Sequence, residues 1–201
     1  MFKDAGRAKQ RLYYLDDEGA HAFPLDLVPF GAITKGSDEI AWPPELKTIM
    51  NVAGYEDVLA AAEWVEFAAG FQQKVVSVAG LAILKLVAWS DRGRDDPKDA
   101  LDLAFIMDSY ANAGNVDRVY EVDGVIEAGD YDQDAAGVYL LGLDMQRVAS
   151  EMTSGVIINI IERDFDRLVT EMIKPSRFLE NIEARITSRL RLLQQALLRT
   201  P

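Results

Sequence analysis

The acidic residue Asp26 lies inside the apolar segment FPLDLVPF, whose composition is typical of a β-strand. Strand alternation predicts that Asp26 shares a face with Val28 and Phe30. A carboxylate among apolar side chains is costly unless a cation or a metal ion accompanies it. Two interpretations follow: a structural salt bridge to Arg11 or Lys35, or a ligand of a metal ion.

A second group of charged residues is spread over two predicted helices. Lys85 lies in a segment that is apolar on almost every side, so its ammonium is expected to be largely buried and to need an acidic partner. Arg92 follows two turns later on the same face, and Asp99 and Asp102 share a face of the next helix. Antiparallel packing would bring the cations opposite the carboxylates. Two interpretations remain: a structural ion network, or a site that binds phosphate and handles a proton.

Two other motifs give weaker signals. The segment Asp130–Asp134 resembles the start of a calcium loop, but Ala135 and Leu141 stand where such a loop needs Gly and Glu. We therefore expect a turn, with Asp134 as the cap of the following helix. Gly36-Ser37 is not followed by a lysine at the spacing of a phosphate-binding loop, and we expect an ordinary loop.

The elements that must position these residues change character along the chain. Strands are predicted over residues 11–15, 23–30 and 48–53, the first two as a hairpin. Helices are predicted over residues 56–69, 78–91 after the cap Ser77, 97–111, 135–149 after the cap Asp134, 155–173 and 178–197, with short helical turns over 115–130. The predicted fold class is α+β, a small antiparallel or mixed sheet followed by a mainly helical part.

Composition excludes several functions. The chain has 201 residues, no Cys and one His, so disulfides, cysteine nucleophiles and zinc sites built on two histidines are excluded. Its net charge of −12 disfavours a protein that coats nucleic acid. We expect the arginines of the C-terminal segment to form a solvated face of an amphipathic helix, with contact to a partner or to RNA as the alternative: Arg185, Arg189, Arg191 and Arg199. No segment reads as a membrane span, and we predict a cytoplasmic protein.

Several segments in order resemble a known family: LDLVPFGAI, IAWPPE, LAILKLVAWSDR, KDALDL and EAGDYDQDAAGVYLLGLD. Together they cover most of residues 11–150 and resemble the nucleotidyltransferases of the AbiEii/AbiGii toxin type. The resemblance implies a polymerase-beta-like core followed by a helical domain, and a role in toxin–antitoxin or phage-defence systems. It also implies transfer of a nucleotide from an NTP to an acceptor, a tRNA for some members.

The resemblance assigns roles to the residues described above. Asp26 matches the third carboxylate of a Mg²⁺ site and is expected to be catalytic. Lys85 and Arg92 match the basic part of the helical motif and are expected to contact the nucleotide triphosphate. Asp99 and Asp102 match its acidic part and are expected to be catalytic, by handling a proton or by orienting the basic pair. Phosphoryl transfer is mostly positioning and charge neutralisation, which suits these residue types.

One departure from the family limits this assignment. The Gly-Ser turn and D-x-D strand that supply the first two metal ligands should precede residue 11, where only ten residues stand. We therefore predict a truncated nucleotidyltransferase with an incomplete metal site, composed of residues 1–54, a remnant of the core, and 55–201, a helical domain. It would be an enzyme if the missing carboxylates are supplied. The alternative is a non-catalytic module that forms a homo-oligomer or binds an antitoxin through an exposed sheet edge and helical face.

Overall fold

The computed structural model describes residues 2–4, 10–19, 21–34, 38–42, 46–47, 49–93 and 95–199. The chain divides into two compact units, Met1–Val52 and Ala53–Pro201, and each is described by itself. This division lies two residues before the boundary expected after residue 54. The predicted Gly36-Ser37 loop and a salt bridge to Lys35 fall outside the described residues.

The first unit consists of small antiparallel sheets. Its elements are β1 (Phe2–Asp4), β2 (Arg11–Leu15), β3 (His21–Asp26), the 3₁₀ turn η1 (Ala32–Thr34), β4 (Glu39–Ala41) and β5 (Ile49–Asn51). The order β1-β2-β3 makes one sheet, and β4 pairs with β5. The predicted hairpin is confirmed: β2 pairs antiparallel with β3, and the rings of Tyr14 and Phe23 stack 4.9 Å apart across it.

The second strand of that hairpin is shorter than predicted. β3 ends at Asp26, so the expected face shared by Asp26, Val28 and Phe30 is wrong. Pro29 has no N–H to donate to a strand ladder, which explains why the pairing does not continue. Pro24 is tolerated inside β3 because, among the described strands, β3 pairs with β2 alone and lies at the edge of the sheet.

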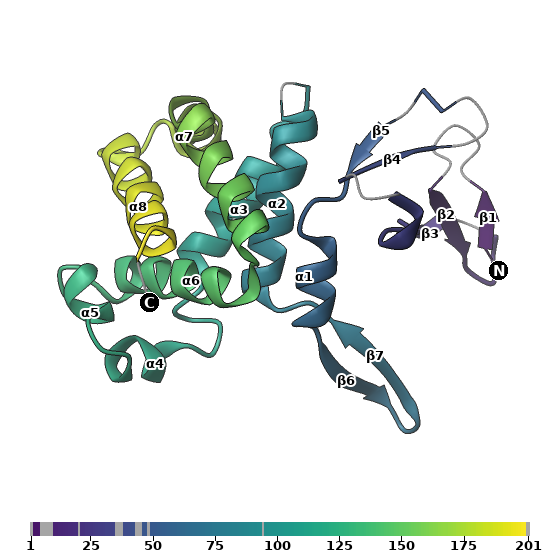
Figure 1. Ribbon diagram of the computed structural model, residues 1–201, viewed down its shortest axis with the longest axis horizontal. Helices are drawn as coiled ribbons and strands as arrows, with labels where there is room; N and C mark the ends of the chain where they lie inside the picture. The colour runs from purple at the N-terminus through teal and green to yellow at the C-terminus, as the bar shows by residue number, and fades with distance from the viewer. Residues whose placement is uncertain are drawn as a thin grey trace. The chain divides into compact units, whose positions relative to one another are not determined.

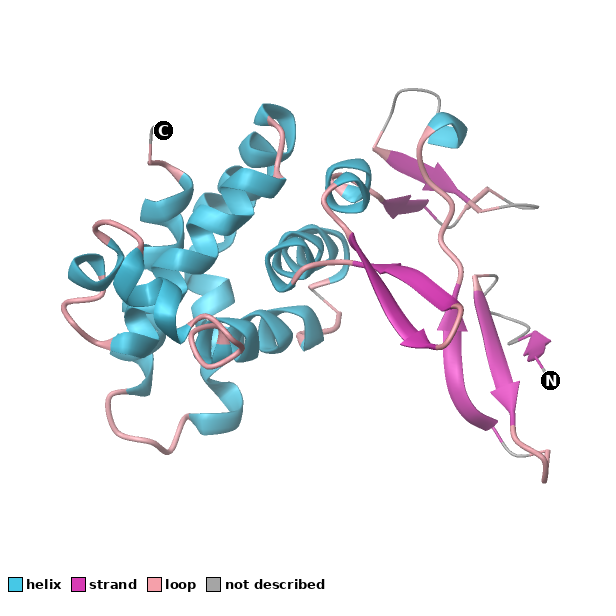
Figure 2. Cartoon of the chain, turned by 90° about the horizontal axis from the view of Figure 1, so that it is seen from below, coloured by secondary structure: helices cyan, strands magenta, loops and turns pink. Residues whose placement is uncertain are grey.

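The second unit is mainly helical (Figures 1 and 2). Its elements are α1 (Tyr55–Ala60), β6 (Glu63–Ala68), β7 (Phe71–Val75), α2 (Val78–Arg92), α3 (Lys98–Ser109), α4 (Val116–Glu121), α5 (Val125–Ala128), α6 (Gln133–Val148), α7 (Glu151–Ile173), the 3₁₀ turn η2 (Lys174–Ser176) and α8 (Ile182–Leu197). The α+β class is therefore confirmed, with strands gathered in the first half of the sequence.

A hairpin replaces most of the helix predicted over residues 56–69, so that prediction is wrong. Only the short helix α1 forms, and β6 then pairs antiparallel with β7. The segment also contains Trp64 and Phe67, aromatic residues outside the helical period that favour strands. Gly70 adopts φ 76° in the tight turn between the strands, a conformation that glycine takes without steric cost.

Caps set the helix starts that position the charged residues. The hydroxyl of Ser77 accepts a hydrogen bond from the backbone at the start of α2, as predicted. α6 is capped by Asp132 and not by Asp134, because the helix begins two residues earlier than expected. The starts of α3 at Lys98 and of α7 at Glu151 differ from the predicted ones by one and four residues.

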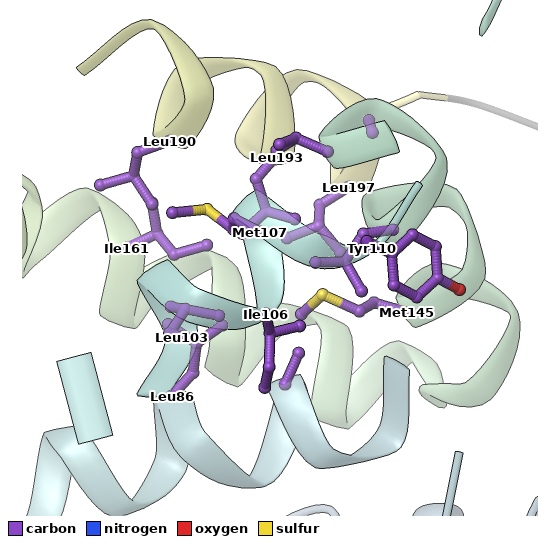
Figure 3. Close-up of a cluster of buried hydrophobic side chains, with 14 of the residues drawn as sticks. Leu86, Leu103, Ile106, Met107, Tyr110, Met145, Ile161, Leu190, Leu193 and Leu197 are labelled. Carbon is purple, nitrogen blue, oxygen red and sulfur yellow. The ribbon is translucent and has the colours of Figure 1, made fainter. Parts of the chain in front are cut away.

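The hydrophobic core of this unit gathers around one face of α3. Leu103, Ile106 and Met107 on α3 are buried with side chains of α2, α6, α7 and α8 (Figure 3). Labelled members from those helices are Leu86, Met145, Ile161, Leu190, Leu193 and Leu197. Because one face of α3 is committed to this core, its remaining positions carry the charged and exposed side chains.

Candidate functional site

Four charged side chains of α2 and α3 meet at the surface between these two helices. Lys85 Nζ lies 3.3 Å from Asp99 Oδ1 and 2.5 Å from Asp102 Oδ2. Arg92 donates from Nε to Asp99 Oδ2 at 2.7 Å and from Nη2 to Asp99 Oδ1 at 3.0 Å. The later cation on α2 pairs with the earlier carboxylate on α3, so the helices are antiparallel and the predicted juxtaposition is confirmed.

Asp99 is the centre of this cluster and is fully buried. Burial by itself raises the pKa of the Asp99 carboxyl, but hydrogen bonds and charges from Arg92 and Lys85 outweigh it, and the pKa is lowered. Asp99 is therefore an anion at neutral pH. The guanidinium of Arg92 offers one edge to both of its oxygens, a bidentate geometry that fixes the orientation of both groups.

The two cations are more accessible than the carboxylate that holds them. The side chain of Lys85 is 20% exposed and that of Arg92 is 56% exposed. Burial acts to lower the pKa of Lys85, but the hydrogen bonds and charges of Asp102 and Asp99 raise it overall. The pKa of Arg92 is raised as well, first by its hydrogen bonds to Asp99. Both side chains are therefore fixed positive charges that reach the surface.

Tyr55, the first residue of α1, belongs to the same neighbourhood and was missed by the sequence argument. Burial raises the pKa of its hydroxyl, and the charges of Arg92 and Asp99 also act on it, in opposite directions. The sequence did not indicate that Tyr55 lies near these charges, because Tyr55 belongs to a separate helix and no helical period relates it to the residues of α2 and α3.

Asp26 belongs to the first unit and forms a salt bridge across the β2–β3 hairpin. Arg11 Nε donates to Asp26 Oδ1 and Arg11 Nη2 donates to Asp26 Oδ2, both at 2.7 Å. The two residues are direct cross-strand partners, which explains the fit. The salt bridge to Arg11 is thus confirmed as one of the two interpretations, while a catalytic or metal-binding role for Asp26 stays a prediction.

The described residues do not fit a Mg²⁺ site. Magnesium needs carboxylate oxygens that are not already neutralised by protein cations. Asp26 has both oxygens against Arg11, Asp99 has both against Arg92, and Asp102 is bound to Lys85. Among the residues that the structure describes, no three acidic or histidine side chains cluster in a way that could hold a metal ion.

The arginines of the C-terminal helix do not all form the expected solvated face. Arg189 is buried and forms an ion pair with Asp108 of α3, and burial lowers the pKa of its guanidinium. Arg185 remains half-exposed beside the same carboxylate, 3.8 Å away. The prediction was wrong for Arg189 because the amphipathic pattern does not show that a neighbouring helix supplies a carboxylate at this position.

Comparison with known families decides the relationship. Residues 5–175 match the family described as the nucleotidyl transferase AbiEii toxin of type IV toxin–antitoxin systems. The chain belongs to the AbiEii toxin family. Searches among curated proteins and among solved structures returned no match.

Membership of the AbiEii family confirms the resemblance found in the sequence and covers both units of the chain. The matched range includes Asp26 and all four residues of the α2–α3 cluster. It places the chain among nucleotidyltransferase-like toxins, for which an antitoxin belongs to the same system. In the described ranges, no helix combines the length and the apolar character that a membrane crossing requires.

Proposed function

We propose that this AbiEii-family chain takes part in nucleotidyl transfer from an NTP to an acceptor, and that Lys85 and Arg92 contact the triphosphate. One observation carries the proposal: a fully buried anion, Asp99, holds two cations whose side chains still reach solvent. Fixed, partly desolvated cations are the groups that neutralise a polyphosphate during phosphoryl transfer.

Each residue of the cluster has a distinct role in this proposal. Asp99 is a positioning residue, because burial and three hydrogen bonds from cations leave it no access to substrate. Arg92 presents the rest of its guanidinium to the phosphates, and Lys85 supplies a point charge. Asp102 is the exchangeable partner: it is more than a third exposed and holds Lys85 until a phosphate takes its place.

The proposed reaction balances with these groups. The acceptor hydroxyl oxygen forms a bond to the α-phosphorus of the NTP, and the bond from that phosphorus to the bridging oxygen of the β-phosphate breaks. Pyrophosphate leaves beside Lys85 and Arg92, and the hydroxyl proton passes to the released carboxylate of Asp102. No step is assigned to Mg²⁺, because the described carboxylates are already paired with cations.

Label transfer tests this proposal. The full chain is incubated with each α-labelled NTP, divalent cations and total tRNA, and labelled RNA is measured. We expect transfer that Lys85→Met abolishes and that Arg92→Lys reduces, because lysine keeps the charge but loses the bidentate contact.

Lys174→Met is the matched control, since Lys174 is an exposed lysine on η2 paired with Glu171. Absence of transfer with every NTP, or equal activity of Lys85→Met and wild type, contradicts the proposal. Asp26→Ala tests separately whether Asp26 is catalytic.

A second candidate function, self-association, is favoured by the β6–β7 hairpin. Every residue of both strands is exposed. The pairing register places Val65, Phe71 and Val75 on one face together with Glu63 and Gln73, and the rings of Phe67 and Phe71 lie 6.2 Å apart at the irregular pairing after Glu66. Exposed aromatic and branched apolar side chains gathered on a hairpin are typical of an interaction surface, and a second copy of the chain offers the same face for a symmetric contact.

Sedimentation distinguishes this candidate. We expect the wild-type chain to dimerise at micromolar concentrations and the double variant Phe67→Ser, Phe71→Ser to be monomeric. Phe178→Ser is the control, because Phe178 is exposed outside the hairpin. A wild-type chain that stays monomeric at high micromolar concentration counts against self-association; binding to an antitoxin through the same face would then have to be shown directly.

A further inference from the structure

An exposed aromatic residue stands one turn beyond the charged cluster on α3. Phe105 follows Asp102 by three residues and is 73% exposed, although its neighbours Leu103, Ile106 and Met107 are buried in the core. Positions three apart on a helix are surface neighbours, and the rise between them is about 4.5 Å. The ring of Phe105 therefore lies beside the cluster and not within the core.

The neighbouring helix continues this apolar surface. On α2, Leu81 precedes Lys85 by one turn and Val78 precedes Leu81 by another, and both are exposed large hydrophobic residues. Lys85 pairs with Asp102 between antiparallel helices, so one turn further along places Leu81 and Phe105 at the same level. An apolar strip on two adjacent helices thus begins where the four charges end.

We infer that Phe105, with Leu81 beside it, is the platform on which the base of a nucleoside triphosphate stacks while its phosphates lie at Lys85 and Arg92. The inference rests on the proposed function. Asp99, which binds both cations, and Phe105 are six residues apart, about 9 Å along the helix axis, a distance that ribose and phosphate chain can span. Along the two helices the cations come first and the aromatic ring follows, as the phosphates and then the base follow one another in a nucleoside triphosphate.

The chemistry of the strip predicts how it would treat different bases. An aromatic ring and aliphatic side chains offer a face for stacking and no donors or acceptors for the edge of a base. Stacking on such a face tolerates any base, so the platform would contribute affinity to all four NTPs and would leave discrimination among them to other parts of the protein.

Binding measurements on the full chain test the platform separately from the phosphate site. Isothermal titration compares ATP and CTP with inorganic tripolyphosphate, which has charges but no base. We expect Phe105→Ala to weaken binding of both NTPs by about 5- to 150-fold and to leave tripolyphosphate binding unchanged. Phe105→Trp should retain NTP affinity. Phe178→Ala is the matched control, because Phe178 is also highly exposed (80%) but comes from the segment before α8.

The outcomes separate the platform from the proposed function. Unchanged NTP affinity in Phe105→Ala, with tripolyphosphate binding that Lys85→Met abolishes, overturns the platform and supports the phosphate site. Loss of NTP affinity in Phe105→Ala, with tripolyphosphate binding indifferent to Lys85→Met, supports the platform and contradicts the proposed phosphate contacts. A wild-type chain that binds neither tripolyphosphate nor NTP overturns both.

Discussion

Substitution of Asp99 by Asn should destabilise the helical unit far more than the same change at Asp102. Asp99 is fully buried and accepts three hydrogen bonds from Arg92 and Lys85. The amide of Asn carries no charge, keeps one acceptor oxygen and replaces the other with an NH2 group whose hydrogens point toward a cation. Breaking a buried ion pair from one side costs about 3–5 kcal/mol, because the remaining charge is left without compensation.

The exposure of the two cations lowers that expected cost. Arg92 is 56% exposed and Lys85 is 20% exposed, so both can regain some hydration once the carboxylate is neutral. Lys85 also keeps Asp102. We therefore expect Asp99→Asn to lower the free energy of unfolding by about 3 kcal/mol, and the midpoint of thermal unfolding by about 6–12 °C. Asp102→Asn breaks a more exposed pair and should cost about 1 kcal/mol or less.

Circular dichroism at 222 nm during urea unfolding measures both variants, because the described α-helices all lie in the second unit. The pH dependence adds a second readout. The pKa of Asp99 is lowered in the folded state, so its contribution is complete above the unfolded-state value of about 3.9 and is lost as the pH falls through the folded value. The stability difference between wild type and Asp99→Asn should therefore shrink in acid. Equal costs for Asp99→Asn and Asp102→Asn, or a difference independent of pH, would refute the buried-anion argument.

Three further substitutions test packing and electrostatics elsewhere. Gly142→Ala should lower the unfolding free energy by about 1–3 kcal/mol, because a Cβ at this position would lie 2.5 Å from a side chain of α8. Gly155→Ala should raise the unfolding free energy slightly, because the space around Gly155 is open. Urea unfolding compares the two variants, and equal effects would contradict this packing. Tyr110→Phe should cost about 1–2 kcal/mol at neutral pH, because the hydroxyl donates to Asp144 at 2.5 Å. Burial raises the pKa of Tyr110 when folded, so this cost should fall as the pH rises above about 10, and a constant cost would be inconsistent with a buried hydroxyl. Asp26→Asn should leave the melting temperature unchanged at high salt, since its pair is more than a third exposed, and a large loss there would show a structural role beyond the hairpin.

The sequence predicted the cluster of α2 and α3 correctly because a helical pattern and the need of a buried charge for a partner pointed to the same residues. Lys85 had to be buried because of the apolar residues around it, and a buried ammonium needs an anion. The three-residue spacing of Asp99 and Asp102 then left the facing helix as the source of that anion. Similarly, Ser77 could be recognised as a cap because the residues after it form an unbroken helical pattern.

The β6–β7 hairpin shows where such reasoning fails. Alanine and valine recur in residues 58–69 at a helical period, and alanine favours a helix. The structure instead follows the turn at Gly70 and the cross-strand register from Glu63 to Val75. Neither strand face is buried in the described residues, so no alternation of buried and exposed positions was available to reveal the strands.

The platform residue was missed for a related reason. Phe105 has the sequence surroundings of a core residue, since Leu103, Ile106 and Met107 beside it are all buried. Whether an aromatic residue among apolar neighbours lies inside or outside depends on which helix packs against that face. That is a tertiary property, and a helical period alone does not determine it.

The exposure of the cluster bears on the two interpretations that the sequence left open. A network that served only to join α2 and α3 requires neither cations that solvent can reach nor an exchangeable partner for one of them. Here the anion is buried completely, while Arg92 remains more than half exposed and Lys85 is shared with the accessible carboxylate of Asp102. The contact between Arg92 and the buried Asp99 is fixed, whereas the contact between Lys85 and the accessible Asp102 can be exchanged. An incoming phosphate could replace Asp102 without disturbing the contact between Arg92 and Asp99, so the arrangement can hold the helices together and still bind an anion.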